Sequence, residues 1–159
     1  VRPLLPLLRR LVQNHGVRVR AVGAGRAAEA DALPGLELVP WSEETEVREV
    51  QGFDIGIMPL IDGPFERGKS GYKLIQYMAC GLPVVGSPVG VNSDIVSPDV
   101  GYLATDERSW EQALSALIGD ADLRQQLGAS GRAKAVADYS LQSQAPRLID
   151  LFREVLGSR

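Results

Sequence analysis

The chain has 159 residues, 45% of them hydrophobic and 23% charged, which is typical of one globular domain with a sizeable core. The net charge of −3 argues against a general nucleic-acid-binding surface, because binding to phosphate backbones needs a basic patch. A single cysteine, Cys80, excludes an internal disulfide framework and fits a reducing compartment, so we expect a cytoplasmic protein.

The chain opens with a predicted helix and strand. Residues 1–14 place leucines on one broad face and arginines on the other, which is the pattern of an amphipathic helix. His15 and Gly16 end this helix, and we interpret the lone histidine as a surface residue at a helix end. Residues 17–22 alternate apolar side chains with arginine and predict a strand.

The next segment, Gly23-Ala-Gly25-Arg-Ala-Ala28, fits a dinucleotide-binding fingerprint. That fingerprint requires a full helix after the glycines and an acidic residue at the end of the next strand. Here Pro34 limits the helix to a short turn over residues 26–32, and the next strand, residues 36–39, carries only Glu37, in its middle. We therefore prefer a glycine-rich strand end that opens a loop over nicotinamide or flavin binding.

A second helix is predicted after Trp41 and Ser42. Ser42 is a candidate N-cap before an acidic first turn, and Val47 and Val50 are expected to face inward. Trp41 follows the carboxyl end of a strand, where it either walls a base pocket or is a structural tryptophan.

Residues 54–90 form the centre of the predicted fold. Two short apolar runs, residues 55–58 and 83–85, are bounded by glycine or proline and predict buried strands. The helix between them has an apolar stripe of Leu74, Ile75, Met78 and Ala79. A strand, loop, helix and strand in about thirty residues make a parallel crossover unit.

Two of the three lysines of the chain, Lys69 and Lys73, lie at the start of this helix. The N-terminus of a helix carries unpaired N–H groups and a partial positive charge, so a nearby cation is unfavourable for the helix alone. Because Gly68 and Gly71 also let the backbone approach a ligand, the pattern indicates a bound phosphate. The alternative is a solvated loop whose lysines occur there by chance.

The remaining sequence continues the alternation of strands and helices. It predicts a short helix or turn at residues 91–94, a strand at 101–104, a helix after Asp106, and helices at 123–139 and 141–156. Residues 1–159 therefore form a single doubly wound α/β domain.

Nearly the whole chain resembles the C-terminal, donor-binding half of a GT-B glycosyltransferase of the family 4 type (glycosyl transferases group 1). The most specific match is Tyr77-Met-Ala-Cys-Gly-Leu-Pro-Val-Val85, followed by Ser87 and Gly90. The resemblance implies a Rossmann-like parallel sheet that binds a nucleotide-sugar donor, transfer with retention of anomeric configuration, and no metal or cofactor. It also implies that a separate N-terminal domain supplies the acceptor.

The resemblance carries the nucleotide site onto one stretch of this sequence. It places the diphosphate cradle on Gly71, Tyr72 and Lys73, with Lys69 on the approach, and a base pocket beside Trp41 and Ser42.

The resemblance also implies two glutamates eight positions apart, and the chain has neither of them. The glutamate that normally holds the ribose hydroxyls falls on Gln76, which can still form hydrogen bonds. The glutamate that normally contacts the donor sugar falls on Gly68, so either Glu66 or Lys69 substitutes for it, or the sugar is held differently.

In the family the domain starts with a further strand, which would lie upstream of Val1 together with the acceptor domain. We therefore expect one half of an enzyme without transferase activity of its own, whose other half could attach peripherally to the inner face of a membrane. The first strand of a doubly wound sheet is central, so its absence would leave unpaired edges on its neighbours.

Two alternatives remain open beside this interpretation. One is a GT-B-like epimerase or phosphorylase. The other is a non-catalytic nucleotide-binding module such as a flavodoxin-like receiver domain, but a receiver domain needs acidic residues clustered at early strand ends, and residues 22–25 contain none. Binding of a nucleoside diphosphate, rather than of a phosphosugar or Mg²⁺, separates these alternatives.

Overall fold

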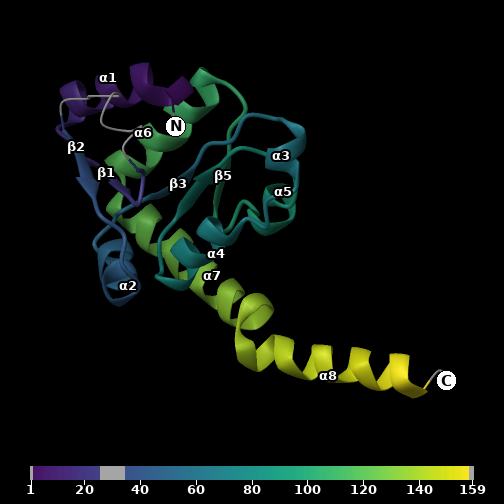
Figure 1. Ribbon diagram of the computed structural model, residues 1–159. Coiled ribbons are helices and arrows are strands. Elements are labelled where there is room, and N and C mark those ends of the chain that lie inside the picture. Colours follow the sequence, from purple (N-terminus) through teal and green to yellow (C-terminus); the bar gives the residue numbers. More distant parts are fainter. Residues whose placement is uncertain (1, 26–34, 158–159) are drawn as a thin grey trace.

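The computed structural model describes residues 2–25 and 35–157, which form parallel strands flanked by helices (Figure 1). The strands are β1 (Val19–Val22), β2 (Leu36–Val39), β3 (Gly56–Met58), β4 (Val84–Gly86) and β5 (Gly101–Leu103). The helices are the 3₁₀ turn η1 (Arg2–Leu4), α1 (Leu5–His15), α2 (Glu43–Gln51), α3 (Pro64–Arg67), α4 (Tyr72–Ala79), α5 (Asn92–Ile95), α6 (Glu107–Gly119), α7 (Ala121–Tyr139) and α8 (Leu141–Gly157).

The strands form two separate parallel sheets. One sheet has the order β1-β2, and the other has the order β3-β4-β5, so the predicted crossover through α4 joins two paired strands. Among the described residues β1 pairs only with β2, and β3 pairs only with β4, which leaves one edge of each unpaired. Such open edges are what the absence of a central strand predicts.

Two apolar clusters cover the opposite faces of the larger sheet. Val85 of β4 belongs to a cluster built on α1 and α6, whereas the preceding residue, Val84, belongs to a cluster built on α4 and α7. Successive side chains of a strand point to opposite faces, so β4 contributes to both cores. Both valines are fully buried.

Several helix ends match their sequence signals. Gly16 ends α1 in the left-handed conformation (φ 65°) and donates its N–H to the carbonyl of Val12. At the start of α6, the N–H of Ser109 donates to Asp106 Oδ1 at 2.8 Å and the N–H of Asp106 donates to Ser109 Oγ at 3.0 Å. This reciprocal cap explains why the helix begins directly after Asp106.

Some local predictions were wrong. Val47 is 55% exposed, because the inward face of α2 runs through Glu46 and Val50, four residues apart, and Val47 lies beside that face. Ser42 stands at the N-cap of α2, but its hydroxyl bonds the hydroxyl of Thr45 at 2.9 Å and does not cap the helix. Ala79, at the end of α4, is exposed, although Leu74 and Met78 are fully buried.

Other differences concern the ends of elements. The first helix is α1, which begins at Leu5 after a 3₁₀ turn, and the first strand is limited to Val19–Val22. The turn predicted for residues 26–32 lies outside the described residues.

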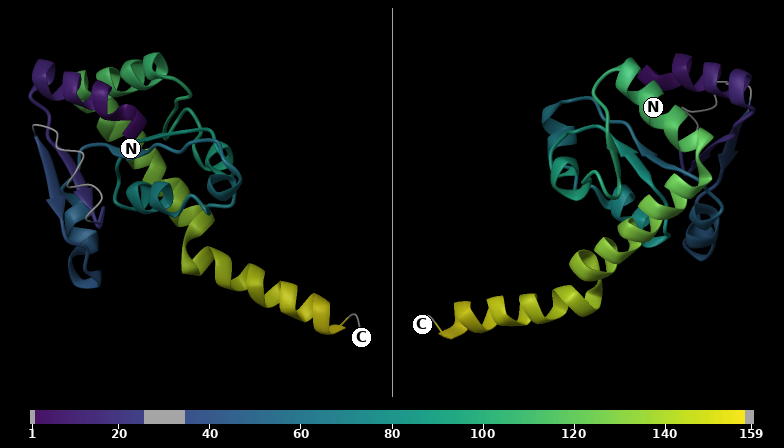
Figure 2. Two further views of the ribbon diagram at one scale, coloured as in Figure 1. Left: turned by 45° about the horizontal axis from the view of Figure 1, so that its top comes forward. Right: turned by 180° about the vertical axis from the view of Figure 1, so that it is seen from behind.

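The C-terminal helix α8 extends away from the rest of the molecule (Figure 2). Among its residues, Leu141–Gly157, none is buried, and its large apolar side chains are exposed. The described helices include none that is both long and apolar enough to cross a lipid bilayer.

Candidate functional site

The predicted site residues gather at one edge of the two sheets. Trp41 and Ser42 follow β2, the loop of residues 59–71 follows β3, and Ser87 follows β4. Since all strands are parallel, these segments leave the carboxyl ends of their strands on the same side. Open α/β sheets bind ligands at that edge.

The start of α4 has no side-chain cap. Gly71 occupies the N-cap with φ 66° and is buried, and a Cβ added there would lie 2.2 Å from Ile95 Cδ1. Glycine is therefore required both for the left-handed backbone and for the close packing. Because Gly71 has no side chain with which to cap the helix, the N–H groups of the first turn are left for water or a ligand.

The loop after β4 holds this helix start in place. Ser87 Oγ accepts the N–H of Leu60 at 3.0 Å, and Asn92 Nδ2 donates to the carbonyl of Ser87 at 3.0 Å. A Cβ on Gly90 would lie 2.5 Å from the carbonyl oxygen of Arg67, so glycine lets this loop pack against α3. Ser87 and Gly90 thus have a structural role in the motif that carried the family resemblance.

Both lysines at this helix start contact nearby side chains. Lys73 Nζ lies 3.0 Å from Glu46 Oε1 and 3.1 Å from Gln76 Oε1. Lys69 Nζ lies 5.3 Å from the ring centroid of Phe65, a cation–π distance. Lys73 Nζ also lies 5.9 Å from the centroid of the exposed Tyr72 ring. Both lysines therefore lie near an exposed aromatic ring, and Lys73 has polar partners as well.

Glu46 joins the predicted parts of the site, and the sequence did not identify it. Its side chain is only 16% exposed, and interactions with Lys73, Gln76 and Trp41, in that order, lower its pKa. Trp41, Gln76 and Lys73, the candidates for contact with the base, the ribose and the diphosphate, thus all interact with the Glu46 carboxylate. In the sequence Glu46 belongs to an acidic first turn, and nothing in the residue spacing connects it to Lys73.

The two candidates for contact with the donor sugar occupy different surroundings. Glu66 lies on α3 with its carboxylate close to Gly63, where an added Cβ would be 2.7 Å from Glu66 Oε2. Lys69 follows α3, and its N–H donates to the carbonyl of Glu66 at 3.1 Å. Glu66 therefore belongs to α3, whereas Lys69 belongs to the short segment that leads from α3 to Gly71 and α4.

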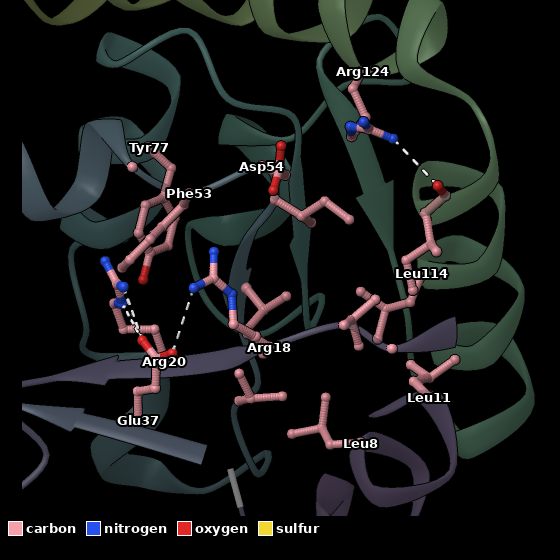
Figure 3. A pocket seen from close by; sticks show the side chains of 17 residues that line it. Leu8, Leu11, Arg18, Arg20, Glu37, Phe53, Asp54, Tyr77, Leu114 and Arg124 are labelled. Carbon is pink, nitrogen blue, oxygen red and sulfur yellow. Dashed lines mark hydrogen bonds and ion pairs between the residues drawn. The ribbon is translucent and has the colours of Figure 1, made fainter. Parts of the chain in front are cut away.

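A cavity of about 360 Å³ lies between the two sheets, away from this site (Figure 3). Its apolar wall includes Leu8 and Leu11 of α1 and Leu114 of α6. Its polar wall includes Arg20, whose guanidinium pairs with Glu37 at 2.8 Å. The cavity also borders residues 16–20, 52–55 and 57, so it lies along the edges of β1 and β3 that no described strand pairs with, and it reaches the amino ends of these strands.

Within residues 2–25 and 35–157, no three His, Cys, Asp or Glu side chains gather in a way that could hold a metal ion. The candidate site consists of backbone N–H groups, lysines, an amide and a carboxylate.

Comparison with known families gives one match. Residues 1–120 match the model of the family described as glycosyl transferases group 1. No curated protein sequence matched the chain.

Several solved structures share the fold. Sucrose-phosphate synthase from Thermosynechococcus elongatus has a TM-score of 0.78 at 19% identity, over 99% of this chain and 43% of that one. HepE from Anabaena, in complex with UDP-glucose, has a TM-score of 0.76 at 15% identity, over 96% of this chain and 44% of that one. The C-terminal domain of a group 1 glycosyl transferase from Francisella tularensis has a TM-score of 0.66 at 14% identity, over 87% of this chain and 78% of that one. The chain thus spans less than half of the first two structures.

Proposed function

The chain belongs to the glycosyl transferases group 1, and on that premise we propose that it is the donor-binding domain of a retaining hexosyltransferase. In this proposal the parent enzyme transfers a sugar from a nucleoside-diphosphate sugar to an acceptor hydroxyl. A separate N-terminal domain of the parent binds the acceptor.

The observation that carries the proposal is the start of α4. Gly71 leaves the N–H groups of Tyr72 and Lys73 open to an anion, and the Lys73 ammonium, which pairs with Glu46 in the structure, turns to a bound diphosphate in this proposal. A diphosphate bound there receives backbone hydrogen bonds and a charge-assisted bond from the ammonium. The same groups stabilise the negative charge that develops on the diphosphate when the bond to the sugar breaks.

The other site residues extend this arrangement along a nucleotide. Gln76 lies one helical turn after Lys73 and hydrogen-bonds the ribose, while Trp41 supplies an aromatic face for the base. Glu66 or Lys69 contacts the sugar on the far side of the diphosphate. The complex of Anabaena HepE with UDP-glucose, on a related fold, supports a nucleotide-sugar as the donor class.

Calorimetric titration tests this assignment. We expect the chain to bind one of UDP, GDP and ADP and to bind the corresponding nucleoside more weakly, because the diphosphate interacts with α4. Lys73→Ala should weaken binding of the diphosphate. Lys134→Ala is the matched control for that variant, since this third lysine lies on α7 near Ser97. A folded chain that binds none of the three diphosphates, or that prefers a sugar phosphate, would contradict the proposal; the latter result would favour a phosphorylase.

A further inference from the structure

Glu46 lies between the groups proposed for the two ends of a nucleotide. Its carboxylate lies 3.0 Å from the ammonium of Lys73, the residue proposed for the diphosphate, and Trp41, the residue proposed for the base, lies two residues before α2. The ribose of a nucleotide connects its base to its phosphates, so a ligand that contacts both residues carries its ribose past Glu46. We propose that the Glu46 carboxylate binds the 2′- and 3′-hydroxyls of the donor nucleotide, an inference that rests on the proposed function.

The surrounding contacts position this carboxylate. Lys73 Nζ lies 3.0 Å from Glu46 Oε1 and also 3.1 Å from Gln76 Oε1, so the ammonium bridges α2 and α4. The backbone N–H of Glu46 donates to the carbonyl of Ser42 at 3.0 Å, which fixes the residue in the first turns of α2. With a side chain only 16% exposed, Glu46 is held before a ligand arrives.

A carboxylate suits a vicinal diol chemically. When ionised it only accepts hydrogen bonds, and its two oxygens offer about four acceptor sites, of which the bond from Lys73 occupies one. The hydroxyls then take the place of the weaker interactions with Gln76 and Trp41 at the remaining sites. The interaction with Lys73, followed by those with Gln76 and Trp41, lowers the pKa of Glu46 and favours the ionised form. Bonds from hydroxyls to an ionised oxygen are stronger than bonds to the neutral amide of Gln76.

This assignment also accounts for Gln76, where the resemblance implies a glutamate. The carboxylate is present in the site, but it comes from α2 and not from α4, and Gln76 is linked to it through Lys73. Glu46 and Gln76 then act as one unit on the ribose.

A purely electrostatic role for Glu46 makes a different prediction. If Glu46 only neutralised Lys73, Glu46→Gln would free the lysine and tighten diphosphate binding regardless of the sugar hydroxyls. A contact with the ribose instead appears as a change in the preference for a ribonucleotide over its 2′,3′-dideoxy counterpart. The same loss of ribose preference also appears when the bare nucleoside binds, because a nucleoside has no phosphate that Lys73 could contact.

The experiment measures dissociation constants of UDP, GDP and ADP, of their 2′,3′-dideoxy forms and of the matching nucleosides. The proteins are the 159-residue chain, Glu46→Gln, and the control Glu44→Gln, which makes the same charge change at an exposed position of α2. Circular dichroism and thermal melting establish that each variant folds.

We expect the unmodified chain to prefer the ribonucleotide by roughly tenfold or more, as for hydrogen bonds to a charged group. Glu46→Gln should lose most of that preference, and Glu44→Gln should retain it. An unchanged preference in Glu46→Gln, or an unmodified chain that binds diphosphates without any ribose preference, overturns the inference and leaves the proposed function intact. If the folded chain binds none of the three nucleoside diphosphates, the proposed function itself fails, and the inference fails with it.

Discussion

Lys73 and Lys69 occupy the same loop and helix start, but their surroundings differ. Lys73 lies in the first turn of α4, next to Gln76, whereas Lys69 faces the exposed ring of Phe65 on the approach. We expect Lys73→Ala to weaken nucleoside-diphosphate binding by roughly ten- to hundredfold, the effect of losing a hydrogen bond to a charged group. Lys69→Ala should have a smaller effect, because Lys69 lies before the N-cap Gly71 and outside the first turn whose N–H groups face the anion.

The comparison of nucleoside with nucleoside diphosphate shows where each lysine acts. Lys73→Ala should weaken binding of the bare nucleoside less than binding of the diphosphate, because the nucleoside loses only the positioning of Glu46 by Lys73, whereas the diphosphate also loses its own bond to the ammonium. The melting temperature should change little, since an ion pair with a 45% exposed lysine contributes little. Equal losses for the nucleoside and the diphosphate would place the phosphate away from this helix start.

At the residue scale, the sequence predicted the loop but not its partner. Two lysines beside Gly71 led us to predict an anion site from the sequence, because the electrostatics of a helix N-terminus are local. Glu46 lies 27 positions before Lys73, and only the packing of α2 beside α4 brings them together. Contacts of this kind depend on tertiary structure, which the spacing of residues in the sequence does not predict.

The packing of α7 against the turn after α4 depends on small residues. A Cβ on Gly128, in the interior of α7, would lie 2.0 Å from the carbonyl oxygen of Gly81. Gly128→Ala should therefore destabilise the fold by about 1–3 kcal/mol through overpacking, even though alanine favours a helix by about 1 kcal/mol over glycine. Urea unfolding measures the change.

Gly119 provides the matched control for this substitution. It is the last residue of α6, and a Cβ there meets no atom within 4 Å. Gly119→Ala should be neutral or slightly stabilising. If the two variants unfold at the same urea concentration, α7 can move away from the turn without loss.

Elements whose signals are local were predicted well. Strand β2 lies at Leu36–Val39 as expected, since glycine and proline bound its apolar run, and α6 begins at its capping residue Asp106. The inward face of α2 was predicted wrongly because it includes Glu46, a charged residue that pairs with Lys73 across the site. Hydrophobic periodicity does not detect a helix face that is partly polar.

At the scale of the whole molecule, β1 and β3 each have an edge that pairs with no strand of residues 2–25 and 35–157, and these edges predict that the fold accepts a further strand between them. Neighbouring strands lie about 4.8 Å apart, and the cavity of Figure 3 lies along both edges with apolar walls from α1 and α6. A strand placed before η1 would make α1 the crossover helix to β1, as α4 is between β3 and β4.

We therefore expect an apolar strand of about five residues, joined through a short turn to the amino end of η1, to stabilise the fold by a few kcal/mol. Each buried apolar side chain contributes about 1.5–3 kcal/mol and each ordered residue costs about 1–2 kcal/mol. Urea unfolding compares this extension with one of equal length made of glycine and serine. Equal stability of the two proteins would mean that the gap does not accept a strand.

The length of the chain relative to similar structures leads to a prediction about activity. It spans 43% of the sucrose-phosphate synthase structure and 44% of the HepE structure. We expect the chain to bind a nucleoside diphosphate without transferring sugar, because an acceptor must be held against the donor for transfer. Donor turnover with mixed acceptors is the measurement, and robust transfer by these 159 residues would show that they form a complete enzyme.

The projecting helix α8 has a consequence for hydrogen exchange. None of its residues contributes to either apolar cluster, and Pro146 interrupts its hydrogen-bond ladder. Amide protons of α8 should therefore exchange through local fraying, at rates that do not follow the stability of the domain. Amides of α7 beside Gly128 and Gly131 should exchange far more slowly, since they open only when the core opens. In Gly128→Ala, the amides of α7 should exchange faster than in the unmodified chain, whereas the exchange rates of the amides of α8 should not change.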